Sequence, residues 1–226
     1  MNRTISLLLV TLVSSVAVAE EKHHEDPTRI VTKVGVGVSD TVTLSGSLGL
    51  DDARMVSARI SDNSEWRIGG SWLFDIGIVN FNFSKTDYDN DSYRNNYSVG
   101  SYVPLTYFDI QPAGWMLFPM AGYAYNDGEQ AVPSDDIDGE EYVLMRSSSH
   151  GGYLGMFGVR PIANTKWSVM SFGGAGAGSN SYSSHWVGAG VSYKVNDNLS
   201  FNSFGYYSSD DFGSLNKLSG SFTYQF

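Results

Sequence analysis

Two short runs place serine beside histidine, the pairing from which hydrolases build a nucleophile and its base. They are residues 147–150, Ser-Ser-Ser-His, and residues 183–185, Ser-Ser-His. A nucleophilic serine needs a histidine in contact and an acid or amide that orients the ring. On an extended strand Ser148 and His150 share a face, but their Cβ atoms lie roughly 7 Å apart. No acid or amide can be assigned as the third member, so we predict no catalytic site.

His23 and His24 stand among acids and could suggest a metal site. Adjacent residues point apart on an extended chain and no further ligand is indicated. We therefore expect no metal or cofactor, and interpret residues 20–29 as a solvated periplasmic segment. The chain has no cysteine and a formal net charge of −10. It thus offers neither a thiol nucleophile nor the basic patch that a nucleic-acid partner requires.

The elements that must position these residues alternate apolar and polar side chains with a period of two, the pattern of half-buried β-strands. Val34, Val36 and Val38 alternate with glycines, and similar segments follow to the end of the chain. No helical stripe competes with this pattern. Two glycines at positions 151 and 152 suggest a bulge in a long strand.

The N-terminus has the features of a cleaved secretory signal peptide. Arg3 precedes an apolar core at residues 5–13, and the small residues Ala17 and Ala19 mark a cleavage site. We therefore predict a signal peptide at residues 1–19, a periplasmic segment at 20–29 and one β-domain at 30–226.

The last strand, residues 217–226, places Leu218, Phe222, Tyr224 and Phe226 on one face and small polar residues on the other. It resembles the closing strand of bacterial outer-membrane β-barrels, which ends in aromatic residues at alternate positions. The resemblance implies that Phe222, Tyr224 and Phe226 act as a signal to the barrel assembly machinery. It also implies that this strand pairs with the one containing Val34, Val36 and Val38.

Connections between the predicted strands alternate between short and long, as in outer-membrane barrels with short periplasmic turns and long outer loops. The short ones include residues 109–114, and the long ones include 85–96, 126–141, 176–184 and 208–216. With both ends in the periplasm, the strand count must be even. We predict a closed antiparallel up-and-down transmembrane barrel of twelve strands, with ten and eight as alternatives.

The inner wall of such a barrel is polar. Its arginines could favour anionic solutes in a water-filled pathway, or could pair with acids such as Glu65 in a plugged lumen. Barrels of about eight strands are filled and those of about 16 are open, so twelve leaves both possible. Our lumen-facing candidates are Arg59, Arg67, Asn80, Asn82, Arg146, Ser148 and His150.

Most tryptophans and several tyrosines lie toward strand ends, where amphipathic rings form girdles at the lipid headgroups. Our girdle candidates are Trp66, Trp72, Trp115, Trp167, Trp186, Tyr193 and Tyr224.

The sequence thus predicts a non-enzymatic outer-membrane barrel that is either a narrow solute channel or a structural, surface-interacting protein. Expected partners are outer-membrane lipid, lipopolysaccharide and the barrel assembly machinery. The alternatives are an outer-membrane lipid hydrolase that uses serine and histidine, and a soluble periplasmic β-sandwich.

Overall fold

The computed structural model describes residues 22–133 and 142–226. The predicted signal peptide lies outside these residues, as does the second half of the loop expected at 126–141. Within the described part, no helix has the length and apolar character needed to cross a membrane.

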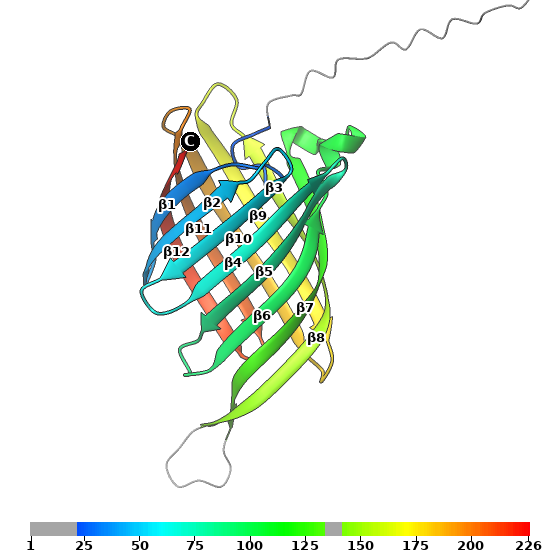
Figure 1. Cartoon of the computed structure of the whole chain (residues 1–226), viewed down its shortest axis with the longest axis vertical. Coiled ribbons are helices and arrows are strands. Elements are labelled where there is room, and N and C mark those ends of the chain that lie inside the picture. Colours follow the sequence, from blue (N-terminus) through cyan, green and yellow to red (C-terminus); the bar gives the residue numbers. More distant parts are fainter. Residues whose placement is uncertain (1–21, 134–141) are drawn as a thin grey trace, which may run out of the picture.

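Twelve strands close into one antiparallel barrel, in which each strand pairs with its neighbours in the chain and β1 pairs with β12 (Figure 1). This confirms the twelve-strand prediction, and the ten-strand, eight-strand and sandwich alternatives are wrong. The strands are β1 (Lys33–Val38), β2 (Val42–Gly49), β3 (Arg54–Ser61), β4 (Trp66–Phe74), β5 (Gly77–Asp87), β6 (Tyr93–Tyr102), β7 (Met116–Pro133), β8 (Tyr142–Pro161), β9 (Trp167–Gly178), β10 (Ser183–Lys194), β11 (Leu199–Asp210) and β12 (Gly213–Gln225).

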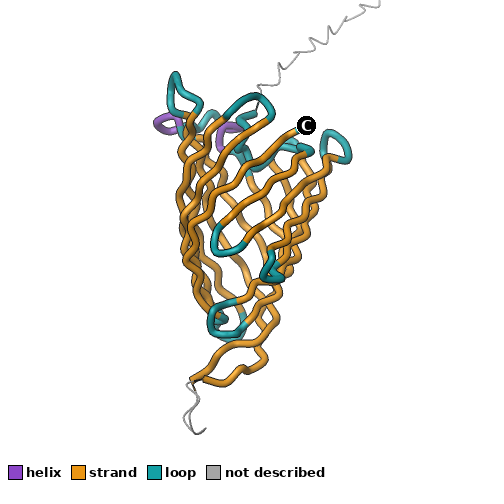
Figure 2. Tube along the Cα trace, turned by 90° about the vertical axis from the view of Figure 1, so that its left-hand side faces the viewer, coloured by secondary structure: helices purple, strands orange, loops and turns teal. Residues whose placement is uncertain are grey.

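The seam that closes the barrel joins the two strands that the sequence singled out. Val34 faces Tyr224 and Val36 faces Phe222 in the antiparallel register of β1 and β12. We call the end where β1 begins and β12 ends the near rim, and the opposite end the far rim. Strands β7 and β8 extend well past the others at the far rim (Figure 1). The outline of the barrel tapers toward that end (Figure 2).

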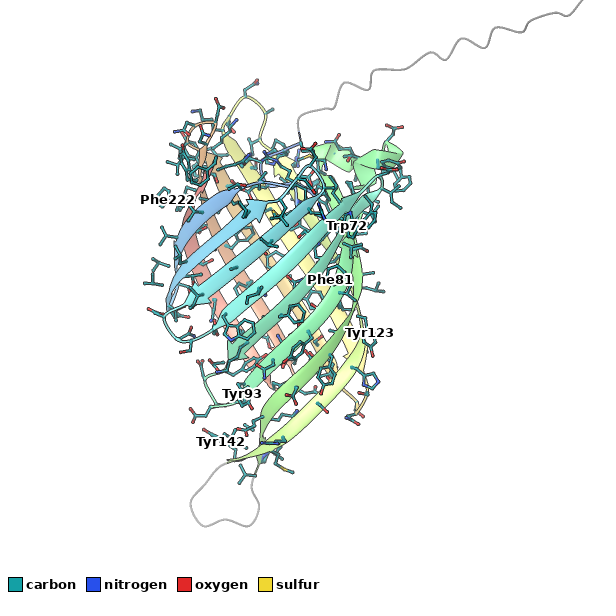
Figure 3. The ribbon with its side chains drawn as sticks, in the orientation of Figure 1. Trp72, Phe81, Tyr93, Tyr123, Tyr142 and Phe222 are labelled. Carbon is teal, nitrogen blue, oxygen red and sulfur yellow. The ribbon has the colours of Figure 1, made fainter. Side chains whose placement is uncertain are left out.

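The outer wall is a continuous apolar surface, because every second residue of each strand points away from the lumen. Trp72, Phe81, Tyr123 and Phe222 lie on this wall (Figure 3). Leu218 is 74% exposed and Leu154 69%, values that would be unfavourable in water over so large a surface. Such a band is stable only against lipid, so the wall faces a membrane.

The predicted alternation of short and long connections is wrong. Several polar segments that the sequence suggested to be loops are instead the ends of strands, where backbone pairing continues. As a result, only Asp211 and Phe212 separate β11 from β12. The longest described connection is instead residues 103–115 at the near rim, which contains two short 3₁₀ helices, Leu105–Phe108 and Pro112–Gly114. The expected bulge at Gly151 is also absent, because β7 and β8 pair in one unbroken register.

Candidate functional site

The candidate site is the lumen of the barrel. Four of the predicted lumen-facing residues, two asparagines and two arginines, lie on its wall. Asn80 on β5 accepts a 2.7 Å hydrogen bond from the Ser71 hydroxyl on β4. Arg67 lines the lumen cavity, and Arg59 stands directly opposite it on β3 and therefore on the same face. Asn82, two residues from Asn80, shares its side of β5.

Arg146, Ser148 and His150 lie on the outer side of β8, so the prediction that they face the lumen is wrong. Ser149 between them is buried and its hydroxyl accepts a 3.3 Å hydrogen bond from the Asn126 amide. Its neighbours must then point outward. Three consecutive serines show no alternation of apolar and polar side chains. The sequence therefore could not indicate which residues of this stretch point toward the lumen.

Trp186 is also misplaced among the girdle candidates. It points into the lumen and meets the Tyr153 ring edge-on, with centroids 6.1 Å apart. A position toward a strand end does not determine which face of the strand a side chain occupies. Val187, the next residue, is 57% exposed and points outward, so Trp186 must point inward. The remaining candidates lie on the outer wall or beside it: Trp66, Trp72, Trp115, Trp167, Tyr193 and Tyr224.

Residues 22–32, which we call the near-rim segment, lie inside the near rim and are not the solvated segment that we expected. His23 Nε2 contacts Ser168 Oγ on β9, and His24 Nε2 contacts Ser192 Oγ on β10, each at 3.0 Å. Both serines are buried on the inner wall. The Ser192 hydroxyl donates to Glu25 Oε1 at 2.9 Å. The charged composition suggested solvation, because the sequence could not show that a polar lumen would supply partners.

Burial makes both histidines of this segment poor bases. Desolvation, helped by the neighbouring His24, Arg29 and Lys194, lowers the pKa of His23 to about 4. Burial also lowers the pKa of His24, although the carboxylate of Glu25 opposes the shift. The docked segment therefore holds neutral imidazoles at neutral pH.

The near half of the lumen has an apolar side and a polar side. Phe118, Val159 and Met170 form a buried cluster on β7, β8 and β9, against which Phe157 and Phe204 pack. The near-rim segment occupies the polar side, next to a small cavity of about 40 Å³ lined by His24, Lys33, Lys194, Asn202, Thr223 and Gln225 among others. Cluster and segment both lie in this half of the lumen.

The far rim is bridged by contacts between strands that are not neighbours in the sheet. Arg94 on β6 forms an ion pair with Asp210 on β11, and the Tyr88 hydroxyl donates to the same carboxylate at 2.9 Å. Tyr88, Tyr182 and Phe212 form a second apolar cluster beside this pair. Burial raises the pKa of Tyr88 and of Tyr182, so both phenols remain neutral donors.

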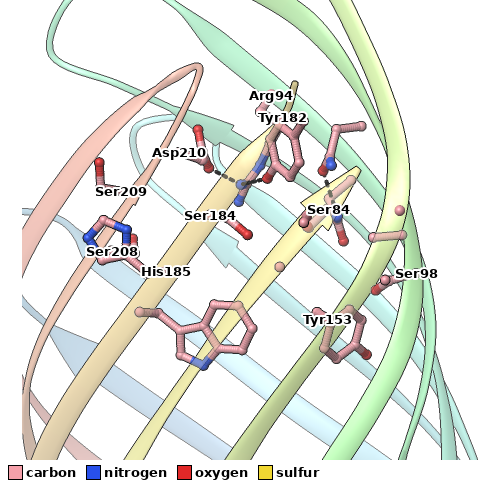
Figure 4. A pocket seen from close by; sticks show the side chains of 18 of the residues that line it. Ser84, Arg94, Ser98, Tyr153, Tyr182, Ser184, His185, Ser208, Ser209 and Asp210 are labelled. Atoms are coloured by element: carbon pink, nitrogen blue, oxygen red, sulfur yellow. Dashed lines mark hydrogen bonds and ion pairs between the residues drawn. The ribbon is translucent and has the colours of Figure 1, made fainter. Parts of the chain in front are cut away.

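A cavity of about 300 Å³ lies in the lumen beside these far-rim contacts (Figure 4). Arg67, Arg94, Ser98, Tyr153, Ser184 and Ser208 are among the residues that line it. Glu65, which in the plugged-lumen alternative would pair with an arginine, instead forms an ion pair with Lys217 at 3.3 Å.

The serine–histidine contacts of the described residues do not assemble a hydrolase site. His150 Nδ1 contacts Ser179 Oγ at 3.2 Å, a partner that the sequence did not suggest because it lies on the next hairpin. No acid or amide contact orients that ring in the described part of the chain. At His24 the acid and the serine meet the same ring nitrogen, so Glu25 cannot orient the imidazole as a triad acid does.

His185 lies on the outer wall beside Tyr207, with ring centroids 5.7 Å apart, while Ser184 faces the cavity. Among the described residues, no group of three or more histidine, aspartate or glutamate side chains could hold a metal ion.

The closed sheet with its apolar outer wall defines the class, a transmembrane β-barrel. No protein-family model and no curated protein matches the chain. Solved structures do. The translocator domain of the autotransporter NalP from Neisseria meningitidis aligns over 86% of each chain, with a TM-score of 0.55 and 12% identity. A NanC porin aligns over 86% of this chain and 98% of its own, with a TM-score of 0.52 and 13% identity. The protein is therefore a transmembrane β-barrel, similar in fold to an autotransporter translocator domain and to a porin.

Proposed function

We propose that the protein is a narrow solute passage of the outer membrane, which the described conformation holds closed. The observation that carries this proposal is the 300 Å³ cavity inside the lumen, lined by arginine, serine and asparagine side chains. A purely structural barrel of this size gains nothing from keeping charged and polar groups around an internal space, because a buried polar group without a partner is unfavourable.

The route past the cavity follows the polar side of the lumen, from Arg67 and Arg59 to Lys33 at the near rim. The near-rim segment lies across this route and is held there by side-chain hydrogen bonds, among which are those of His23 and His24. Each such bond contributes about 0.5–1.5 kcal/mol net, so the segment can undock without unfolding the barrel.

Release of a small solute from liposomes tests the passage. The refolded protein and a variant without residues 22–29 are reconstituted, and efflux of a trapped monosaccharide is compared. The deletion should raise efflux several-fold over the intact chain. Equal efflux from both proteoliposomes and from protein-free vesicles would contradict the proposal.

The second candidate is a structural barrel without transport. The apolar cluster around Phe118 and Met170 favours it, because it fills part of the lumen with side chains that no solute needs. A sealed bilayer that contains correctly folded deletion variant would support this alternative.

The proposal also covers how the barrel is exported, oriented and assembled in the membrane. Cleavage after Ala19 would release the chain into the periplasm, both ends of the barrel would remain there, and lipid and lipopolysaccharide would surround the outer wall. Phe222 and Tyr224 lie exposed on the seam strand, which is consistent with their reading by the assembly machinery.

A further inference from the structure

Two arginines face each other inside the barrel without an acid between them. Arg59 on β3 and Arg67 on β4 are direct register partners. Like charges at directly opposite positions destabilise a sheet. Within residues 22–133 and 142–226, neither guanidinium lies within ion-pair distance of a carboxylate, and Glu65 is engaged by Lys217. The fold therefore retains an unfavourable pair that a bound anion would neutralise.

The second arginine of the cavity adds an unused donor. Arg94 lines the same cavity as Arg67, and its ion pair with Asp210 uses a terminal nitrogen. Arg94 Nε is buried and has no hydrogen-bond partner. Arg67, Arg59 and Arg94 together exceed the single charge of Asp210, so the cavity region keeps an excess of positive charge.

The rest of the cavity wall suits a molecule that carries hydroxyl groups. Ser98, Ser184 and Ser208 offer hydroxyls that donate or accept, and Tyr153 and Trp186 offer ring surfaces. A volume of about 300 Å³ lies at the lower end of the range for ligand pockets, which favours a small molecule over a polymer.

We propose that the lumen cavity binds a small hydroxylated organic anion, whose carboxylate or phosphate group is held by the guanidinium of Arg67. Arginine suits this task because its planar fork donates two parallel hydrogen bonds to an oxyanion. Arg59 strengthens the field at this position, and the serine hydroxyls contact the hydroxyl groups of the ligand. The inference rests on the proposed passage in that it names the class of solute.

Calorimetric titration of the folded protein in a non-ionic detergent tests the site. The probes are gluconate, its uncharged analogue sorbitol, and inorganic phosphate. Gluconate or phosphate should bind and sorbitol should not. Arg67→Gln should weaken binding about tenfold or more, as expected for loss of a charge-assisted hydrogen bond. Arg54→Gln, which removes an exposed arginine paired with Asp51 in a near-rim turn, should leave binding unchanged.

Folding stability in urea separates a ligand site from a structural role. Removal of Arg67 relieves the repulsion with Arg59, so Arg67→Gln should unfold at the same or a higher urea concentration. Absence of anion binding, or binding that Arg67→Gln does not weaken, would overturn the inference. Anion binding by a protein that gives no solute efflux would refute the passage and leave the site in place.

Discussion

At the scale of single residues, Tyr153 packs closely against glycines on the inner wall of the barrel. A Cβ atom added at Gly122 would overlap the Tyr153 ring and the carbonyl oxygen of Val99. At Gly70, on the outer side of β4, an added Cβ meets nothing within 4 Å. A larger side chain is therefore excluded sterically at Gly122 on the inner wall but not at Gly70 on the outer wall.

We expect Gly122→Ala to destabilise the folded barrel by about 1–3 kcal/mol, because overpacking forces the ring or the backbone to move. Urea unfolding in lipid vesicles measures the change. Gly70→Ala is the matched control and should shift the midpoint little. If both substitutions behaved alike, Tyr153 would not be packed as described.

The near-rim segment should respond to pH through its histidines. The pKa of His23 falls from 6.5 to about 4 on docking, so a proton binds the undocked form more tightly. The stabilisation of docking is then complete above pH 6.5 and is lost as the pH falls toward 4. His24 shifts in the same direction, and Glu25, Arg29, Lys33 and Lys194 are the charged groups around the pair.

The chain has no cysteine, so Lys22→Cys carries a single spin label that reports the mobility of the segment. Mobility should rise between pH 6.5 and 4, and the rise should be lost when His23 and His24 are both replaced by glutamine. A pH response that survives the double replacement would show that other groups control docking.

At the scale of elements, the seam strands and the strand count were predictable, because apolar alternation is strong in β1, β4, β5 and β12. The side of the barrel wall toward which residues 146–150 point could not be predicted, because serines occur equally well on either side of such a wall. The near-rim segment was also beyond prediction, since its partners Ser168 and Ser192 lie far away in the sequence. That Arg59 and Arg67 face the lumen followed from the alternation pattern, whereas their direct pairing across β3 and β4 required the register of the structure.

The outward face of β8 can be tested by depth in the membrane. Leu154 and His150 share this face, but Leu154 lies nearer the middle of the barrel wall. Leu154→Arg should cost about 2–4 kcal/mol of folding free energy, the penalty for arginine at the bilayer midplane. His150→Arg, nearer the far rim, should cost about 0–1 kcal/mol. Equal and small effects in vesicle unfolding would contradict a lipid-facing Leu154.

At the scale of the whole molecule, the lumen contains a cavity and, on either side of it, two regions that are held together in different ways. The near half holds a cluster of wall side chains and a segment of the chain itself, whereas Tyr88, Arg94, Asp210 and Phe212 make contacts across the far rim. Each region limits a passage through such a barrel, so the passage is widest when both regions yield. This arrangement predicts that the intact protein has low permeability. It also predicts that weakening both regions in one variant raises the permeability more than weakening either region alone.

Single-channel current across a planar bilayer tests this account most directly. The intact chain, the chain without residues 22–29, and that deletion combined with Phe212→Ala are compared after heat-dependent gel mobility has confirmed folding. The account predicts rare, small openings of the intact protein and frequent, larger ones when both closures are weakened. Bilayers that remain sealed with the folded combined variant would contradict the closed passage and leave a structural barrel.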